Sequence, residues 1–252
     1  MGFLARAILV IWYRDLRLFF GDRARIIGAL GQPLLYLLVV GNGLAPSMSR
    51  GLGESYLAFL FPGIIGMTVL FTAVFSAISI IWDREFGFLK EILVSPVPRP
   101  AIAAGKILGG ASVAFFQGCI VLALGPLLGI RFPWQALPGF LLLMLLGACT
   151  LTAFGLFIAS RMESMQGFQI IMNFLLMPMF FLSGAIFPLT QAPPWMRPLA
   201  TIDPLSYAID GLRAAMGLPL AQYPFWFDAG ILAMMMVLFL FTAVWAFSGE
   251  ER

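Results

Sequence analysis

Several polar and soft side chains lie inside long apolar stretches of the sequence, where they are suited to binding a solute. Thr68 and Thr72 are four residues apart, so their hydroxyl groups face the same side of a helix. Further along the chain, an amide lies among thioether and aromatic side chains: Asn173 with Met172, Met177, Phe180 and Phe181. This combination suits an amphipathic, lipid-like or drug-like solute. The alternative interpretation is helix packing, with Asn173 hydrogen-bonded across a subunit interface.

The sequence offers little catalytic or metal-binding chemistry. None of the 252 residues is histidine, the commonest metal ligand and general base, and both cysteines, Cys119 and Cys149, lie in apolar stretches. The single Gly-Lys pair, Gly105-Lys106, lacks the upstream glycine and the following Ser or Thr of a phosphate-binding loop. We therefore expect no catalytic residue, no metal site and no ATP hydrolysis in this chain.

A charged segment between two apolar stretches, residues 83–106, has the pattern of a contact surface for a soluble protein. Its first half mixes apolar and charged residues at helical spacing, and its second half holds three prolines that stop a helix. A short helix followed by a stiff, proline-rich segment can receive force from a partner better than a flexible tether can. The alternative is a second helix on the membrane surface. The residues expected to make the contact are Arg84, Glu85, Phe88, Leu89, Lys90, Glu91 and Ile92.

The N-terminal segment, residues 1–25, is predicted to form an interface helix along the membrane surface. Within the stretch Phe3 to Phe20, the polar residues Arg6, Tyr13, Arg14 and Arg17 cluster on one narrow face. Asp15 falls on the otherwise apolar side, which indicates that this side meets protein as well as lipid. A plain membrane anchor and a docking element for a soluble partner both fit this pattern.

The composition predicts an all-α integral membrane protein. Hydrophobic residues make up 61% of the chain and charged residues 11%, with a mean hydropathy of +0.98, whereas soluble domains carry about 25% charged residues. Six charge-free runs reach the roughly 20 residues that cross a bilayer. The chain, 1–252, is expected to be a single membrane domain with no separate soluble domain. The expected spans are 26–45, 57–82, 107–130, 137–160, 166–187 and 226–247.

The distribution of basic residues predicts the orientation of these spans. Eleven of the 15 Lys and Arg residues fall in the N-terminal segment, in alternate loops or at the C-terminus. The positive-inside rule places this side in the cytoplasm, so both termini are expected there. The net charge of +3 reflects this topology, and we expect no nucleic-acid partner.

The loop between the fifth and sixth spans, residues 188–225, is predicted to hold one or two short re-entrant helices in the outer leaflet. Asp203 followed by Pro204 is a good helix start, with an N-cap and a proline at the first helical position. Asp210 and Arg213 make this element too polar to cross the bilayer. It is expected either to form an external gate over a pathway or to be a capped surface loop.

Three stretches resemble the permease subunits of type-2 ATP-binding-cassette (ABC) exporters, and most of all the daunorubicin-resistance-like class. They are WDREFGFLKEILVSPVPRPAIAAGKILGG at 82–110, SRMESMQGFQIIMNFLLMPMFFLSGAIFPL at 160–189 and IDPLSYAIDGLRAAM at 202–216. The resemblance implies a homodimer of six-helix permeases in the cell (inner) membrane, bound to two ATPase subunits that hold ATP and Mg²⁺. It also implies that the interface helix and residues 84–94 contact the ATPase, and that the cargo is a drug, a lipid or a lipid-linked glycan.

The competing function class is a non-transporting membrane anchor or assembly scaffold subunit. A scaffold would account for the six spans. It would not need the stiff, proline-bounded segment at 83–106.

Overall fold

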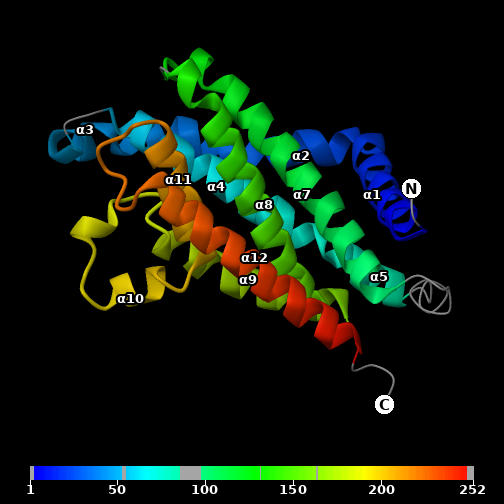
Figure 1. Cartoon of the computed structure of the whole chain (residues 1–252). Coiled ribbons are helices and arrows are strands. Elements are labelled where there is room, and N and C mark those ends of the chain that lie inside the picture. The colour runs from blue at the N-terminus through cyan, green and yellow to red at the C-terminus, as the bar shows by residue number, and fades with distance from the viewer. Residues whose placement is uncertain (1–2, 53–54, 86–97, 131, 163, 249–252) are drawn as a thin grey trace.

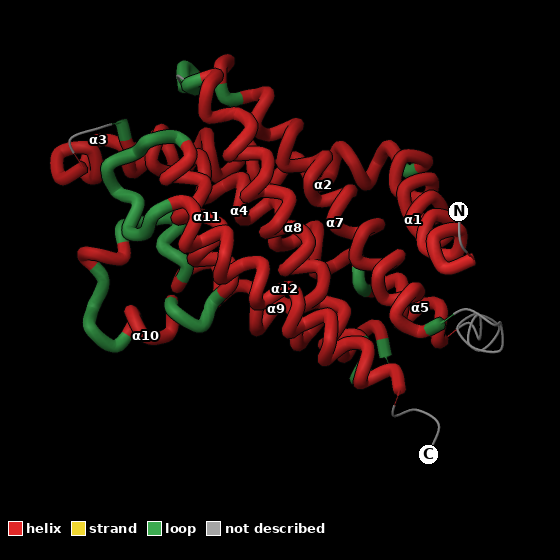
Figure 2. Tube along the Cα trace, viewed as in Figure 1, coloured by secondary structure: helices red, strands yellow, loops and turns green. Residues whose placement is uncertain are grey.

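The computed structural model describes residues 3–52, 55–85, 98–130, 132–162 and 164–248. Within these ranges the chain is helical and contains no strand (Figure 1; Figure 2). The helices are α1 (Phe3–Gly21), α2 (Arg23–Leu35), α3 (Gly41–Leu52), α4 (Tyr56–Ser76), α5 (Ile78–Glu85), α7 (Arg99–Leu124), α8 (Leu137–Ala159), α9 (Met165–Leu182), α10 (Met196–Ala200), α11 (Pro204–Ala215) and α12 (Phe225–Ser248). A π-helical turn, Tyr36–Val40, joins α2 to α3.

Six stretches of the described residues are long and apolar enough to cross a membrane, which confirms the predicted all-α, six-span fold. The first runs through α2 into α3, and the second runs through α4 into α5. The six stretches are Ile26–Pro46, Tyr56–Asp83, Pro100–Leu128, Trp134–Ala159, Met165–Leu182 and Phe225–Trp245.

The ends of the spans separate into two groups in space. Helix α1, the end of α5 and the end of α12 lie toward one end of the molecule, whereas α3, α10 and the turn between α7 and α8 lie toward the other (Figure 1). This grouping agrees with an even number of crossings. The assignment of the first end to the cytoplasm stays a prediction from the charge distribution.

Helix α4 lies at the centre of the bundle, where it contacts α7, α8 and α11. Its aromatic residues Phe59 and Phe61 are at most 1% exposed, as are Phe140 of α8 and Phe168 and Phe180 of α9. Because lipid tails are as apolar as these side chains, such helices associate through close packing and hydrogen bonds rather than through the hydrophobic effect. The core is therefore tightly packed around α4.

One spanning helix begins well before its expected span, and two spanning helices contain a buried charged residue. Helix α7 begins at Arg99 and not at 107, because Pro98 has extended backbone angles and Pro100 is tolerated in the first turn of a helix. Lys106 therefore lies inside α7, where it is buried. Helix α12 likewise includes Asp228, which is fully buried in its first turn. Lys106 and Asp228 thus lie inside membrane-spanning helices.

The outer loop contains the short helices α10 and α11. As predicted, Asp203 is the N-cap of α11: its Oδ1 accepts a hydrogen bond from the backbone N–H of Leu205 at 2.9 Å, and Pro204 is the first helical residue. The residues from Pro204 to Arg213 are buried. The alternative of a capped surface loop is therefore wrong, since α11 packs against α4, α8 and α12.

Candidate functional site

A polar cavity of about 240 Å³ lies between α1, α2, α4 and α7, and we call it the membrane cavity. Thr68 and Thr72 both line it, as their spacing predicted. The Thr68 hydroxyl donates to the backbone oxygen of Ile64 at 2.8 Å, whereas the Thr72 hydroxyl bonds the side-chain oxygen of Gln117 on α7. The other lining residues are Phe19, Gly28, Gln32, Pro33, Met67, Phe71 and Phe75.

Sequence reasoning missed two polar residues of this cavity, Gln32 and Gln117, of which Gln117 is the buried one. Its side chain is 1% exposed, so α7 brings an amide into the middle of an apolar bundle. The signal was present in the sequence, since Gln117 is the one amide side chain within the expected span 107–130. Only the packing of α7 against α4, however, shows that it faces Thr72.

The predicted pathway residues of α9 do not converge on one site. Met172 and Phe180 face the core and are fully buried, and the Phe180 ring packs edge-on against Tyr36 at 5.9 Å. Asn173 is exposed, and so are Met177 and Phe181, at 38% and 45%. The structure therefore divides the five predicted pathway residues between two faces of α9. The alternative, a hydrogen bond from Asn173 to a second subunit, stays a prediction.

The expected contact with a soluble partner falls mostly outside the described residues. Arg84 and Glu85 form the end of α5. The other residues of that prediction, Phe88, Leu89, Lys90, Glu91 and Ile92, lie within 86–97, which the structure does not describe.

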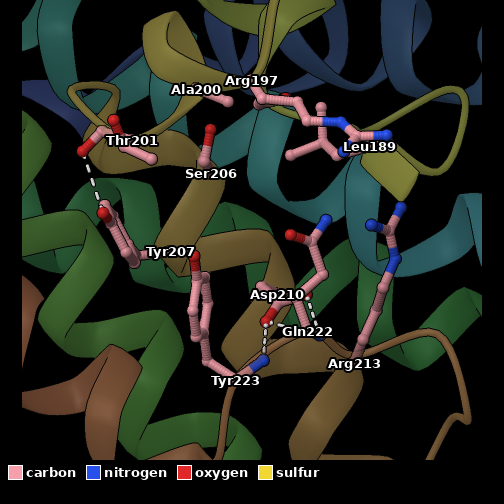
Figure 3. Close-up of a pocket in the computed structure, with 11 residues that line it drawn as sticks. Leu189, Arg197, Ala200, Thr201, Ser206, Tyr207, Asp210, Arg213, Gln222 and Tyr223 are labelled. Atoms are coloured by element: carbon pink, nitrogen blue, oxygen red, sulfur yellow. Dashed lines mark hydrogen bonds between the residues drawn. The ribbon is translucent and has the colours of Figure 1, made fainter. Parts of the chain in front are cut away.

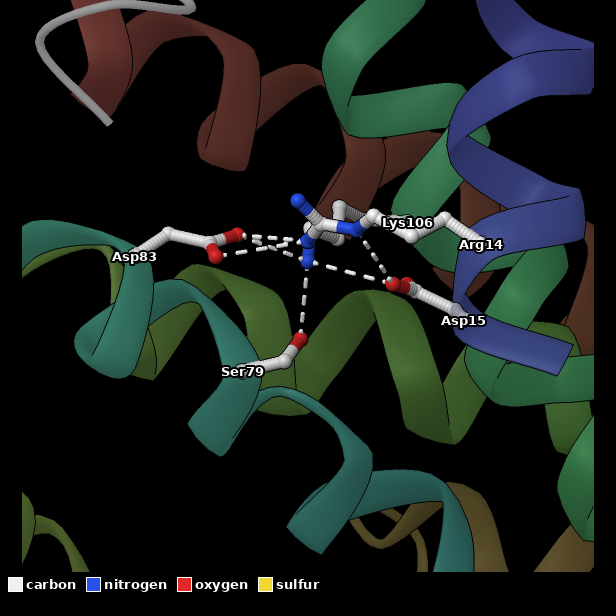
Figure 4. Close-up of polar contacts among 5 residues, drawn as sticks. All are labelled: Arg14, Asp15, Ser79, Asp83 and Lys106. Carbon is white, nitrogen blue, oxygen red and sulfur yellow. Dashed lines mark hydrogen bonds and ion pairs between the residues drawn. The ribbon is translucent and has the colours of Figure 1, made fainter. Parts of the chain in front are cut away.

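Asp83, two residues before the end of α5, belongs to a buried ionic cluster that joins three helices (Figure 4). The Lys106 ammonium of α7 lies 2.9 Å from Asp83 Oδ2 and 3.5 Å from Asp15 Oδ1, and it donates to the Ser79 hydroxyl at 3.0 Å. Arg14 of α1 approaches the same Asp83 oxygen at 2.9 Å. Two cations and two carboxylates thus balance one another where α1, α5 and α7 meet.

Two glycines let α1 lie close enough to α7 for these contacts. A Cβ atom at Gly105 would lie 2.9 Å from Cβ of Ile11, and one at Gly109 would lie 3.0 Å from Cβ of Asp15. Small residues four apart are the usual means of bringing two helices close in a membrane. The inference that the Asp15 side of α1 meets protein is therefore confirmed.

The polar face predicted for the interface helix is only partly available to a partner. Arg6, Tyr13 and Arg17 are exposed. Arg14 instead turns inward to Asp83, with its side chain 32% exposed. Three of the four residues thus remain on the outer face of α1.

A second polar cavity, of about 150 Å³, lies between α10, α11 and the segment before α12, and we call it the outer pocket (Figure 3). It is lined by Ser183, Leu189, Arg197, Ala200, Thr201, Ser206, Tyr207, Asp210, Arg213, Gln222 and Tyr223. Two arginines and one carboxylate are among these residues, so the charges of its lining do not cancel.

Arg213 fixes α11 to the turn that follows α9. Its Nη2 donates to the backbone oxygens of Gly184 and Ala185 at 2.8 and 3.2 Å, and its guanidinium lies 3.9 Å from the centre of the Phe59 ring. Burial lowers the pKa of Arg213 to about 10, so the side chain stays cationic at neutral pH. A positive charge is thereby held inside the end of the molecule that carries α10 and α11.

Asp210 fixes the other side of the outer pocket. Its carboxylate accepts hydrogen bonds from the backbone N–H groups of Gln222 and Tyr223, each at 2.9 Å. Burial raises the pKa of Asp210, while these N–H groups and Arg213 act in the opposite direction. The segment leading into α12 is thus tied to α11 through its backbone.

Residues 6–217 of this chain match the ABC-2 type transporter family. The chain belongs to this family. It is 29% identical over 206 residues to the inner membrane transport permease YadH of Escherichia coli K12, covering 81% of this chain and 80% of YadH. It is 30% identical over 202 residues to nodulation protein J of Rhizobium leguminosarum, covering 79% and 78%. The transport permease ycf38 of Cyanophora paradoxa is 31% identical over 195 residues, which span 75% of this chain and 66% of ycf38.

Membership of the ABC-2 type family confirms the resemblance inferred from the three sequence stretches. The chain is a multi-pass inner-membrane transport permease. An ABC-2 permease works in association with an ABC ATPase and with the membrane.

Proposed function

We propose that this permease forms the transmembrane pathway of an exporter for an amphipathic substrate, such as a drug, a lipid or a lipid-linked glycan. In this proposal a separate ABC ATPase subunit binds ATP and Mg²⁺ and supplies the energy, and the permease has no catalytic site or cofactor of its own. Two copies of the chain form a homodimer around the pathway.

The membrane cavity is the observation that supports this proposal best. Its lining combines hydroxyl and amide groups, from Thr72 and Gln117, with the aromatic side chains of Phe71 and Phe75. Polar groups within the membrane part of a protein are costly, and they usually mark a substrate pathway or a helix contact. A lining of both kinds suits a solute that is itself partly polar.

The ionic cluster offers a route for the energy of ATP hydrolysis. Asp83 lies at the end of α5, directly before the segment expected to contact the ATPase, and it is bonded to Lys106 of α7. Helix α7 also carries Gln117, so one helix connects the cluster to the membrane cavity. A displacement of the α5 end would therefore move one wall of that cavity.

The test is ATP hydrolysis and substrate movement by the permease reconstituted with its ATPase subunit in liposomes. A panel of amphipathic compounds should contain at least one that stimulates ATP hydrolysis and crosses the membrane in an ATP-dependent manner. Gln117→Leu should weaken that stimulation by about threefold or more, since an interhelical hydrogen bond is worth roughly 0.6 to 2 kcal/mol. Gln135→Leu, the same change at an exposed position before α8, is the matched control.

Two results would count against the proposal. A complex that hydrolyses ATP but moves none of the compounds would favour the scaffold or anchor alternative. Wild-type behaviour of Gln117→Leu would remove the membrane cavity from the pathway.

A further inference from the structure

The outer pocket holds more positive charge than its own residues neutralise. Arg197 and Arg213 share its lining with one carboxylate, Asp210, which is already bonded by two backbone N–H groups. Arg213 is 4% exposed, and its Nε–H has no hydrogen-bond partner among the described residues. A buried guanidinium with unused donors is complementary to an anion.

The free polar groups of the outer pocket converge on one region. Figure 3 shows the guanidinium groups of Arg197 and Arg213 ending beside Leu189, with the Gln222 amide pointing toward the space between α10 and α11. Arg197 comes from α10 and is exposed, with its Nη2 donating to the backbone oxygen of Thr190 at 2.9 Å. The remaining donors of Arg197 can therefore reach a molecule that enters from outside.

The surroundings of the outer pocket suit a ligand with an apolar part. Trp195, Leu199 and Ile202 lie within five residues of Arg197 in the chain and are 64%, 44% and 72% exposed. Arginine binds phosphate and carboxylate groups through two parallel hydrogen bonds from its planar guanidinium, which makes it better suited than lysine to an oxyanion with two accessible oxygens. A charged head could thus occupy the outer pocket while an acyl chain lies along the exposed apolar side chains.

We propose that the outer pocket binds the phosphate headgroup of an amphipathic molecule through Arg197 and Arg213. This inference rests on the proposed export function, because it names the headgroup chemistry of the cargo at the outer end of the pathway. A free phosphate ion offers the same oxygens, and the two sources differ only in the apolar chain.

The experiment is calorimetric titration of the full-length chain in a neutral detergent, with no ATPase subunit and no transport. The probes are dihexanoyl phosphatidic acid, dihexanoyl phosphatidylcholine, hexyltrimethylammonium and inorganic phosphate. We expect saturable binding of the phosphatidic acid and much weaker binding of the zwitterionic and cationic probes. Equal binding of inorganic phosphate would support the anion site and assign it to a free ion.

Variants at exposed positions keep the test independent of folding. Arg197→Gln should weaken phosphatidic acid binding by about tenfold, as expected for a lost hydrogen bond between charged groups. Gln222→Glu should weaken it and Gln222→Lys should strengthen it, since the backbone N–H of Gln222, which bonds Asp210, is retained in both. Arg161→Gln, which removes an exposed arginine that lies over the Trp245 ring, should leave binding unchanged.

Tighter binding of the cationic probe, no saturable binding of phosphatidic acid or phosphate, or equal effects of Arg197→Gln and Arg161→Gln would overturn the proposal. Because the titration needs no ATP, these results would leave the proposed export function standing. Conversely, a failure of ATP-driven transport would leave a measured anion site in place.

Discussion

Lys106 shows how a cationic side chain is held inside a membrane helix. Its side chain is 5% exposed, and Asp83, Asp15 and Ser79 surround the ammonium. Removing one member of a buried ion pair leaves an uncompensated charge, which costs about 3 to 5 kcal/mol, whereas removing both partners costs much less. The stability contributed by this residue therefore depends on its partners being present.

We predict that Lys106→Met strongly destabilises the permease, because two carboxylates then share the single cation Arg14. Arg14→Gln should lower the free energy of unfolding by only about 0 to 1 kcal/mol, since Arg14 is partly exposed and solvent screens its charge. The measurement is thermal unfolding of the purified chain in detergent. The double variant Asp83→Asn, Lys106→Met should recover part of the loss, and no recovery would show that the ionic cluster is not the cause.

Asp203 provides a pH-dependent contribution to stability. Burial raises its pKa from 3.8 to about 7, although the N–H of Leu205 and the hydroxyl of Ser206 favour the charged form. The folded state therefore holds a proton that the unfolded state has already lost between about pH 4 and 7. Stability contributed by this group falls as the pH rises through that window and is constant above it.

We predict that Asp203→Asn removes this pH dependence while keeping an N-cap, because Asn caps helices as well as Asp. Between pH 4 and 8, the free energy of unfolding of the wild-type chain should fall by up to about 4 kcal/mol relative to that of the variant, since one pKa unit corresponds to 1.36 kcal/mol. Thermal unfolding at several pH values measures this difference. Parallel curves for the two proteins would contradict it.

At the scale of elements, the contact between α1 and α7 decides whether α1 is part of the bundle or only rests on lipid. Gly105 allows this contact, because a Cβ there would lie 2.9 Å from Ile11 Cβ and 3.2 Å from the backbone oxygen of Ile8. A backbone atom cannot move aside as a flexible side chain can. The position of α1 therefore depends on the size of one residue in α7.

We predict that Gly105→Ala destabilises the permease by about 1 to 3 kcal/mol, the usual cost of overpacking, and lowers the amount of ATPase subunit that co-purifies. The spans should still insert, since their hydropathy is unchanged. Gly230→Ala is the matched control, because nothing lies within 4 Å of a Cβ at Gly230 in α12. Equal effects of the two substitutions would show that α1 does not need close contact with α7.

At the scale of the whole molecule, the distribution of basic residues predicts the orientation in the membrane. In a background with Cys119→Ala and Cys149→Ala, we predict that Ser49→Cys and Gln191→Cys react with an impermeant thiol reagent added to intact cells. Ser95→Cys should not react, because the charged segment 83–106 is expected in the cytoplasm. Labelling of Ser95→Cys from outside would reverse the orientation or break the six-span topology.

The sequence by itself determined the number and type of the spans, the helix start at Asp203 and the family. These features depend on local properties, since hydropathy over about 20 residues and a capping side chain act without distant contacts. The expected start of the third span, at 107, was less accurate. Lys106 was taken as a boundary there, although packed neighbours let α7 continue through it.

Only the tertiary structure decided which polar residues meet. Lys106 lies far along the chain from Asp15, and Arg213 from Phe59, so nothing in the local sequence predicts that they touch. The same holds for Gln117, whose partner Thr72 is on another helix, and for α9, whose pathway residues the fold divides between two faces. Side-chain chemistry is a property of the sequence, whereas the juxtaposition that gives a cavity its charge arises from helix packing.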